Sequence, residues 1–170
     1  HGELINPDSI NFPDSLKYYT PADRVVYGGG GIMPDIFIPF DSTRYSDYYV
    51  DLRRNSLFNS YVLDYVENER KLLLKEYEDF DDFNAGFYID DGFLESFVSY
   101  AEEKEVIKDE EGLKQSENDI KYVLKALIAR NLYDINAYFK VISEVDDAYV
   151  RAVEALMNEE LFEKLKLSEK

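Results

Sequence analysis

The stretch NSLFNSYVLDYVENERKLLLKEY, residues 55–77, decides the fold class of this chain. Its apolar residues return every three or four positions, which is the period of an α-helix, whereas a half-buried strand alternates every second residue. The expected apolar face consists of Phe58, Tyr61, Val62, Tyr65, Val66, Leu72 and Leu73. Because a face about 100° wide must be covered by other helices, the stretch predicts one helix of a multi-helix domain.

The same period continues toward the C-terminus in residues 91–104, 109–133, 134–143 and 146–166. Asp91 and Asp109 begin two of these stretches and are the expected N-caps, because an aspartate oxygen accepts hydrogen bonds from the first free backbone N–H groups of a helix. The short connection at 144–146 favours antiparallel or angled neighbours. The expected faces are Phe93, Leu94, Phe97, Val98 and Ala101; Leu113, Ile120, Leu124, Leu127 and Ile128; Ile135, Tyr138, Phe139 and Ile142; and Val150, Val153, Met157 and Leu161.

Toward the N-terminus the composition changes sharply. Residues 1–43 hold all five prolines and five of the eight glycines, and no proline follows them. Proline and glycine interrupt helices and mark turns. The sequence therefore predicts a mainly α protein, in which an extended, Gly/Pro-rich segment with a short β-strand pair (residues 1–43) precedes a multi-helix C-terminal domain (residues 44–170).

The strand pair is expected within RVVYGGGGIMPDIFIP, residues 24–39, where strands at Arg24–Tyr27 and Asp35–Ile38 would flank a glycine turn. A phosphate-binding loop is excluded, because no lysine followed by Ser or Thr comes after Gly31 and Met33 stands where a dinucleotide fingerprint needs its third glycine. Two strands alone have bare edges, so we expect residues 1–43 to dimerise through them or to be held loosely.

The charge balance excludes several classes of partner. The chain has 36 acidic and 19 basic residues and a net charge of −17, which repels nucleic-acid phosphates and anionic lipid surfaces. No apolar run approaches the ~18 residues of a membrane span. The absence of cysteine excludes a thiolate nucleophile, a disulfide framework and Cys-based zinc sites. We therefore expect no nucleic-acid partner and no membrane span.

No stretch of the sequence specifies a reaction. The sequence therefore predicts no catalytic, cofactor-binding or metal-binding residue. The single histidine is His1, which nearly excludes a Ser-His-Asp triad or a histidine metal site. Lys140 and Ser143 could face each other across one helical turn, but a lysine beside a serine is ordinary helix surface. Paired carboxylates are too abundant among 36 acids to identify a glycosidase-like pair.

The acidic stretch YEDFDDFNAGFYIDDGF, residues 77–93, invites comparison with a calcium loop. An EF-hand needs oxygen ligands at positions 1, 3 and 5 before its glycine. Those positions are Asp81, Phe83 and Ala85 before Gly86, and Phe87, Ile89 and Asp91 before Gly92. Both registers lack ligands, so the stretch predicts a helix–helix connection with acidic caps.

RVVYGGGGIMPDIFIP resembles the strand–turn–strand that closes the protease core of carboxyl-terminal processing peptidases, also called tail-specific proteases. The G-x-x-P-D motif of that family corresponds to Gly31, Ile32, Met33, Pro34 and Asp35. Residues 1–20, 48–70 and 124–142 resemble the long C-terminal extension of one bacterial branch, so that the likeness spans nearly the whole chain.

The resemblance implies a parent serine endopeptidase with a Ser nucleophile and a Lys general base. Such enzymes carry a PDZ domain, act in the periplasm or cell envelope on protein or peptide substrates, and need no cofactor. The family places its lysine between glycines and its serine before a small residue, and neither pattern occurs here. Because the chain starts at His1 without an initiator Met, we expect it to be the non-catalytic C-terminal piece of such an enzyme, which braces, gates or oligomerises the parent through contacts with the catalytic and PDZ segments or a second copy.

Two alternatives stay open. An acidic, helical protein-interaction module would bind a basic partner and release it as salt screens the charges over a Debye length of about 8 Å. An unrecognised carboxylate hydrolase would need a cleft with two acids whose pKa values are pushed apart.

Overall fold

The computed structural model describes residues 14–21, 25–28, 36–39, 41 and 43–161. The chain forms two compact units, Ser42–Asp146 and a second unit that combines His1–Asp41 with Asp147–Lys170. The described residues are mainly helical, which confirms the predicted fold class.

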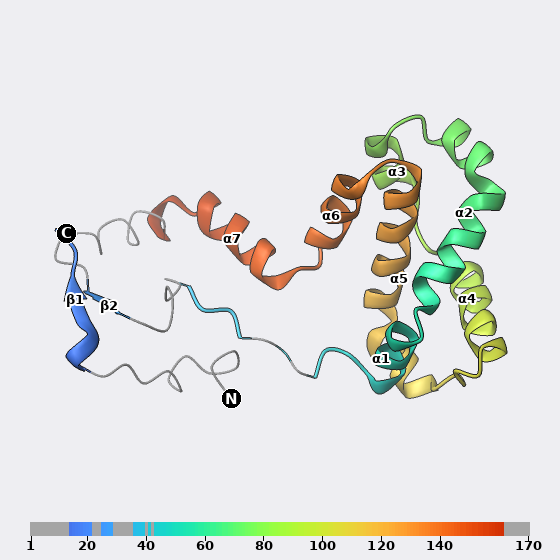
Figure 1. Cartoon of the computed structure of the whole chain (residues 1–170). Coiled ribbons are helices and arrows are strands. Elements are labelled where there is room, and N and C mark those ends of the chain that lie inside the picture. Colours follow the sequence, from blue (N-terminus) through green and yellow to red (C-terminus); the bar gives the residue numbers. More distant parts are fainter. Residues whose placement is uncertain (1–13, 22–24, 29–35, 40, 42, 162–170) are drawn as a thin grey trace. The chain divides into compact units, whose positions relative to one another are not determined.

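The unit of residues 42–146 is a multi-helix bundle (Figure 1). Its helices are α1 (Asp47–Arg54), α2 (Leu57–Glu76), α3 (Phe80–Gly86), α4 (Asp91–Glu103), α5 (Glu110–Leu132) and α6 (Ile135–Ser143). Helix α5 packs against α1, α2 and α6, while α2 also packs against α4. Ile120, Leu124 and Ile128 of α5 are fully buried, as the helical period of residues 109–133 predicts.

Helix α2 confirms the period of residues 55–77 but begins later than predicted. Ser56 adopts the left-handed conformation, with φ at 58°, and thereby separates α2 from α1, a helix that periodicity did not identify. Phe58, Val62 and Val66 are buried as expected. Leu72 was wrongly assigned to the buried face and is 59% exposed, because the core-facing stripe continues through its neighbour Leu73 instead.

Aspartate side chains begin most of these helices. Asp90, not the predicted Asp91, caps α4 by accepting a hydrogen bond from Phe93 N at 2.7 Å, since the residue before the first helical turn must remain extended to reach back. Asp109 caps α5 as predicted, by accepting from Glu111 N. Asp79 and Asp134 cap α3 and α6 in the same way. The predicted acidic caps between residues 77 and 93 are thus confirmed, but the predicted connection is itself partly helical, because it contains α3.

Helix α4 ends in a hydrogen-bonding pattern that usually contains glycine. Val106 N donates to Ala101 O and Glu105 N donates to Glu102 O, each at 3.0 Å, which is the paired pattern of a Schellman motif. Glu105 occupies its left-handed position, with φ at 66°. The motif turns the chain away from α4 and places the connection to α5 beside it.

The N-terminal turn of α5 approaches α1 closely at Gly112. A Cβ atom at this position would lie 2.9 Å from Tyr48 Cβ and 2.6 Å from Asp109 Oδ2. Only glycine therefore fits between the backbone of α5 and the first turn of α1.

Helix α6 presents a different face to the core from the one predicted. Ala137 and Val141 are buried, whereas Ile135 and Phe139 are 51% and 60% exposed. Tyr138 and Ile142, which were also predicted, are partly buried against the core. The smaller side chains face inward because α6 packs closely along α5, and a nine-residue helix offers more than one apolar face from which tertiary contacts select.

The second unit contains a hairpin that differs from the predicted strand pair. Strand β1 (Lys17–Tyr19) follows a 3-10 turn at Asp14–Leu16 and pairs antiparallel with β2 (Val25–Tyr27), so that Tyr18 lies opposite Val26. The strand predicted downstream of the glycines, Asp35–Ile38, is wrong at residues 36–38, which are not in a strand, while Arg24 and Asp35 lie outside the described residues. The upstream partner is closer in sequence, and glycines raise the entropic cost of pairing across residues 28–31.

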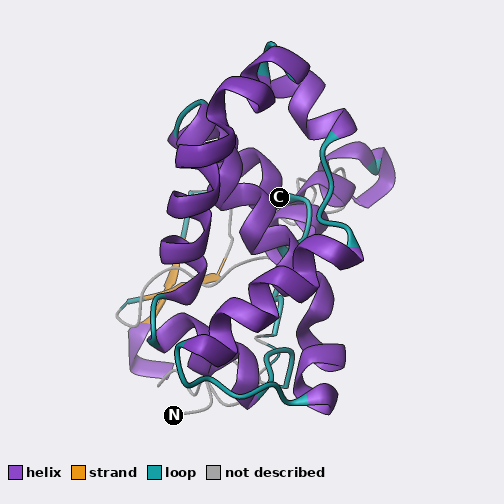
Figure 2. Ribbon diagram, turned by 90° about the vertical axis from the view of Figure 1, so that its right-hand side faces the viewer, coloured by secondary structure: helices purple, strands orange, loops and turns teal. Residues whose placement is uncertain are grey.

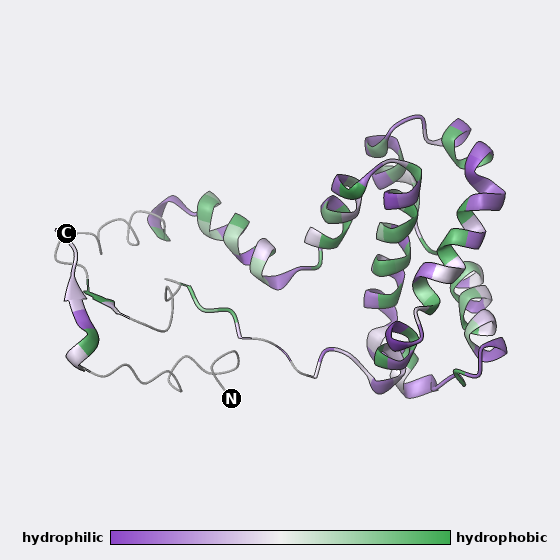
Figure 3. Ribbon diagram, viewed as in Figure 1, coloured by the Kyte–Doolittle hydropathy of each residue, from purple (hydrophilic) through white to green (hydrophobic). Residues whose placement is uncertain are grey.

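Helix α7 (Asp147–Met157) belongs to the same unit. Val150, Val153 and Met157 were predicted to be buried, but they are 39%, 36% and 80% exposed, and Ala155 is the buried residue of the helix. Leu161, the fourth residue of that predicted face, is half-buried. Figure 3 shows the apolar positions along α7. Periodicity establishes that such side chains share a face, but it does not establish that another element covers that face.

Figure 2 shows the helices and the short strands in a second view. Across the described part of the chain, no helix combines the length and the apolar composition that crossing a bilayer requires.

Candidate functional site

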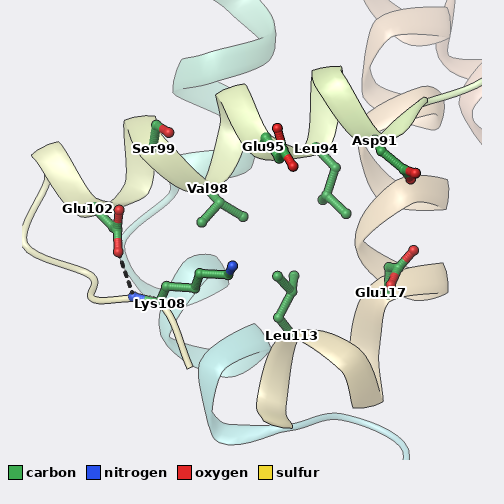
Figure 4. A pocket seen from close by; sticks show the side chains of 9 residues that line it. All are labelled: Asp91, Leu94, Glu95, Val98, Ser99, Glu102, Lys108, Leu113 and Glu117. Carbon is green, nitrogen blue, oxygen red and sulfur yellow. Dashed lines mark hydrogen bonds between the residues drawn. The ribbon is translucent and has the colours of Figure 1, made fainter. Parts of the chain in front are cut away.

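A groove of about 520 Å³ opens between α4 and the first half of α5 (Figure 4). Helix α4 contributes one wall, and the connection before α5 together with the first two turns of α5 contributes the other. The lining residues are Asp91, Leu94, Glu95, Val98, Ser99 and Glu102 on α4, and Lys108, Leu113 and Glu117 opposite them.

Helical spacing explains why the residues of α4 line one wall. Positions 91, 95, 98 and 102 follow each other at intervals of three or four residues and therefore lie on one face of the helix. Leu94 and Val98 point from this face toward Leu113 and form an apolar floor, as Figure 4 shows. The carboxylates of Asp91, Glu95 and Glu102 stand along the rim.

Lys121 contacts two carboxylates at one end of the groove. Its Nζ lies 2.7 Å from Glu117 Oε1 and 3.1 Å from Asp91 Oδ1, so that it links α5 to the start of α4. The hydrogen bond to Glu117 raises the pKa of Lys121, and the hydrogen bond to Asp91 raises it further. Two rim carboxylates are thus partly neutralised by one ammonium group.

At the other end, Lys108 enters from the connection between the helices. Its backbone N–H donates to Glu102 Oε1 at 3.4 Å, and its Nζ lies 2.7 Å from Glu110 Oε1. The hydrogen bond to Glu110 raises the pKa of Lys108. Glu95, in the middle of the rim, makes no hydrogen bond or ion pair with any residue that the structure describes.

The groove carboxylates also affect a buried tyrosine of α1. Tyr48 is 4% exposed, and its hydroxyl has no hydrogen-bond partner among the described residues. Burial raises the pKa of Tyr48 to about 12, and the charges of Glu102 and Asp109 add to this increase. The acidic rim and the core therefore influence each other electrostatically.

This raised pKa predicts a loss of stability in alkali. The unfolded tyrosine ionises near its ordinary pKa of 10.0, whereas folded Tyr48 keeps its proton until about pH 12. Its contribution to folding is therefore complete below pH 10 and is lost as the pH rises from 10 toward 12. Urea unfolding at several alkaline pH values should show a falling free energy of unfolding, and Tyr48→Phe should reduce the slope.

The control for this experiment is Tyr88→Phe, because Tyr88 is 75% exposed. At neutral pH, Tyr48→Phe should not lower the free energy of unfolding, because it removes a buried hydroxyl that has no described partner. An unchanged alkaline slope in Tyr48→Phe would contradict the prediction.

The side chains of Lys140 and Ser143 do not form a hydrogen bond with each other. The ammonium of Lys140 lies over the Phe80 ring, 4.9 Å from its centroid, and Ser143 Oγ donates to Lys140 O at 2.9 Å. No group of three or more His, Cys, Asp or Glu side chains in the described part of the chain converges on a possible metal position. The groove carboxylates are accordingly distributed along a rim and can hold several cationic groups at separate points.

The groove was not predicted from the sequence. The spacing of Asp91, Glu95 and Glu102 was visible within a predicted helix, as was the position of Glu117 on the next long helix. What was missing was the information that residues of α4 and of the start of α5 line one groove above an apolar floor.

Comparison with protein-family models found one match, described as "Family of unknown function (DUF8443)", over residues 48–134. The matched range contains every residue that lines the groove. No curated protein and no solved structure matches the chain.

Proposed function

We propose that this chain, which belongs to that family of unknown function, is the non-catalytic helical C-terminal region of a carboxyl-terminal processing serine endopeptidase. The resemblance of residues 24–39 to the end of the protease core motivates the proposal, although the motif from Gly31 to Asp35 lies outside the described residues. On this proposal the parent enzyme cleaves protein or peptide substrates in the periplasm or cell envelope.

The exposed hairpin is the observation that carries the proposal. All residues of β1 and β2 are exposed, and five of them, Tyr18, Tyr19, Val25, Val26 and Tyr27, are large apolar or aromatic residues that are 36–63% exposed. A two-stranded hairpin of this size is at best marginally stable in water. Aromatic and β-branched residues are typical of strands in a larger sheet. On this proposal the hairpin is the last part of the protease core and extends the sheet of that core.

The helical unit suits a bracing or gating role. It has its own core, in which Phe83, Phe97 and Ile120 are fully buried without a catalytic segment. A rigid body attached to a protease core can restrict access to the catalytic cleft or hold two copies together. The nucleophile and the general base would come from the segment that precedes His1 in the parent chain.

The experiment compares this chain with a longer product of the same gene. The coding sequence before His1 should contain a serine followed by a small residue and a lysine between glycines. The longer product should cleave an unstructured peptide near its C-terminus, and its catalytic Ser→Ala variant should not. This chain alone should leave the same peptide intact.

Two results would overturn the proposal. One is a gene whose reading frame contains no such serine and lysine before His1. The other is peptide cleavage by this chain alone that a substitution within it, such as Ser143→Ala, abolishes. As a control, Ser60→Ala changes an exposed serine of α2 and should have no effect on either product.

The acidic groove favours a second candidate function, that of a helical protein-interaction module. A net charge of −17 together with a groove that carries four carboxylates supports binding to a basic protein. An interaction module of this kind could be part of a larger peptidase, but the function does not require that the chain belongs to one.

A further inference from the structure

We propose that the groove between α4 and α5 binds a basic, amphipathic helical segment of another protein. The segment would place apolar side chains against Leu113 and against the edges of Leu94 and Val98, which are 7% and 5% exposed, and lysine or arginine side chains beside Glu95 and Glu102. This inference specifies the site and the ligand class of the interaction-module function, and it does not depend on the peptidase proposal.

The size and lining of the groove suit side chains of a partner protein. A volume of about 520 Å³ lies within the range of about 300–1,000 Å³ that binding pockets usually occupy. The groove is open along its length. Helix α4 forms one wall, and the connection before α5 together with the start of α5 forms the other, with an apolar floor below a charged rim (Figure 4). A helix that lies in a groove contacts it in this way, through an apolar stripe with charged residues on both sides.

The charges select a cationic occupant. Asp91, Glu95, Glu102 and Glu117 line the groove with Lys108 as the single basic lining residue. Lys121 pairs with Asp91 and Glu117, and Lys108 pairs with Glu110. The charge of Lys108 also acts on Glu102 and Glu95, but neither of these carboxylates forms an ion pair with a described residue, so the negative charge left in the groove is greatest there. A second copy of this chain carries the same net charge of −17 and is therefore disfavoured as the occupant.

The spacing of the carboxylates favours a helix over a compact cation. Glu95 and Glu102 are seven residues apart on α4, which corresponds to about 10.5 Å along a helix axis. A single metal ion cannot contact both carboxylates at this separation. Basic residues seven positions apart on a partner helix repeat at the same distance, with apolar residues of the intervening turns directed at the floor.

The probe is a synthetic, amidated peptide of about 14 residues made of leucine and lysine, with lysines seven positions apart flanking a leucine stripe. A scrambled peptide of identical composition keeps the charge but loses the stripe. Fluorescence anisotropy with the full chain should show binding of the patterned peptide that weakens as salt rises, and weaker binding of the scrambled peptide. Amide chemical-shift changes should map to α4 and to the first two turns of α5.

The decisive variant is the double substitution Glu95→Gln and Glu102→Gln. We expect its affinity for the patterned peptide to fall about tenfold, because two rim charges that face the lysines are removed. The matched control is Glu67→Gln with Glu78→Gln, which removes the same charge from exposed positions outside the groove and should leave the affinity nearly unchanged. Thermal unfolding should show that both variants remain folded.

Equal affinity of the two double variants, equal binding of the scrambled peptide, or no binding at millimolar peptide would each overturn the inference. None of these results bears on the peptidase proposal, which is tested by cleavage with the longer gene product. Conversely, a gene without a catalytic serine and lysine would leave the peptide-binding result unaffected.

Discussion

Phe97→Ala should lower the free energy of unfolding of the helical unit by about 3–5 kcal/mol, the range for removal of a buried phenylalanine. Phe97 is fully buried on α4. Its ring stacks on Phe58 with centroids 5.1 Å apart and meets the edge of Tyr61 at 5.3 Å, so it joins α4 to α2. Alanine would leave a cavity between the helices and remove both ring contacts.

The measurement is urea unfolding followed by far-UV circular dichroism, and a thermal midpoint lower by about 10–20 °C should accompany the change. Phe139→Ala is the matched control, because Phe139 is 60% exposed on α6 and its ring contacts only Tyr138 among the described rings. The control should change the free energy of unfolding by much less. A loss below about 1 kcal/mol in Phe97→Ala would contradict the packing of α4 described above.

Arg44→Ala should have the second largest effect, a loss of about 2 kcal/mol or more. Arg44 Nη2 lies 2.6 Å from Asp119 Oδ1 and 2.9 Å from Val145 O, and Nε also donates to Asp119 Oδ1 at 2.9 Å. One guanidinium thus joins the residues before α1 to the middle of α5 and to the end of the connection after α6. The side chains of Arg44 and Asp119 are 24% and 14% exposed, so little water can replace the missing partner.

The matched control for this prediction is Arg54→Ala. Arg54 lies 3.5 Å from Asp51, but its side chain is 74% exposed, and exposed ion pairs contribute about 0–1 kcal/mol. The double variant Arg44→Met with Asp119→Leu should recover part of the loss, because it removes the carboxylate that Arg44→Ala leaves without its guanidinium. Equal losses in Arg44→Ala and Arg54→Ala would show that the Arg44 contacts add nothing beyond surface charge.

Periodicity predicted the helices well where one face is clearly apolar. In α5, four of the five residues on the predicted face are buried, namely Ile120, Leu124, Leu127 and Ile128, while Leu113 is half-buried. Asp109 is the cap as predicted, because capping depends on residues within one turn. In α6, periodicity failed to choose between two apolar faces. The choice of Ala137 and Val141 over Ile135 and Phe139 depends on how closely the helix approaches α5.

The strand pair shows the same limit. Val25–Tyr27 was correctly identified as a strand, apart from Arg24, which lies outside the described residues. Its partner was placed after the glycines, while the structure pairs it with Lys17–Tyr19. Alternation of side chains indicates that a segment can be a strand, but register and partner are set by the hydrogen bonds that two segments form together.

By itself, the sequence determined that this protein is mainly helical and strongly acidic, because helical period, capping and net charge are properties of neighbouring residues and of composition. Only the tertiary structure decided which apolar faces are buried, which strands pair, and that Leu94 and Leu113 form one floor beneath carboxylates from two helices. The physical reason is distance along the chain. Contacts between residues far apart in sequence depend on how whole helices pack, and no local pattern specifies that packing.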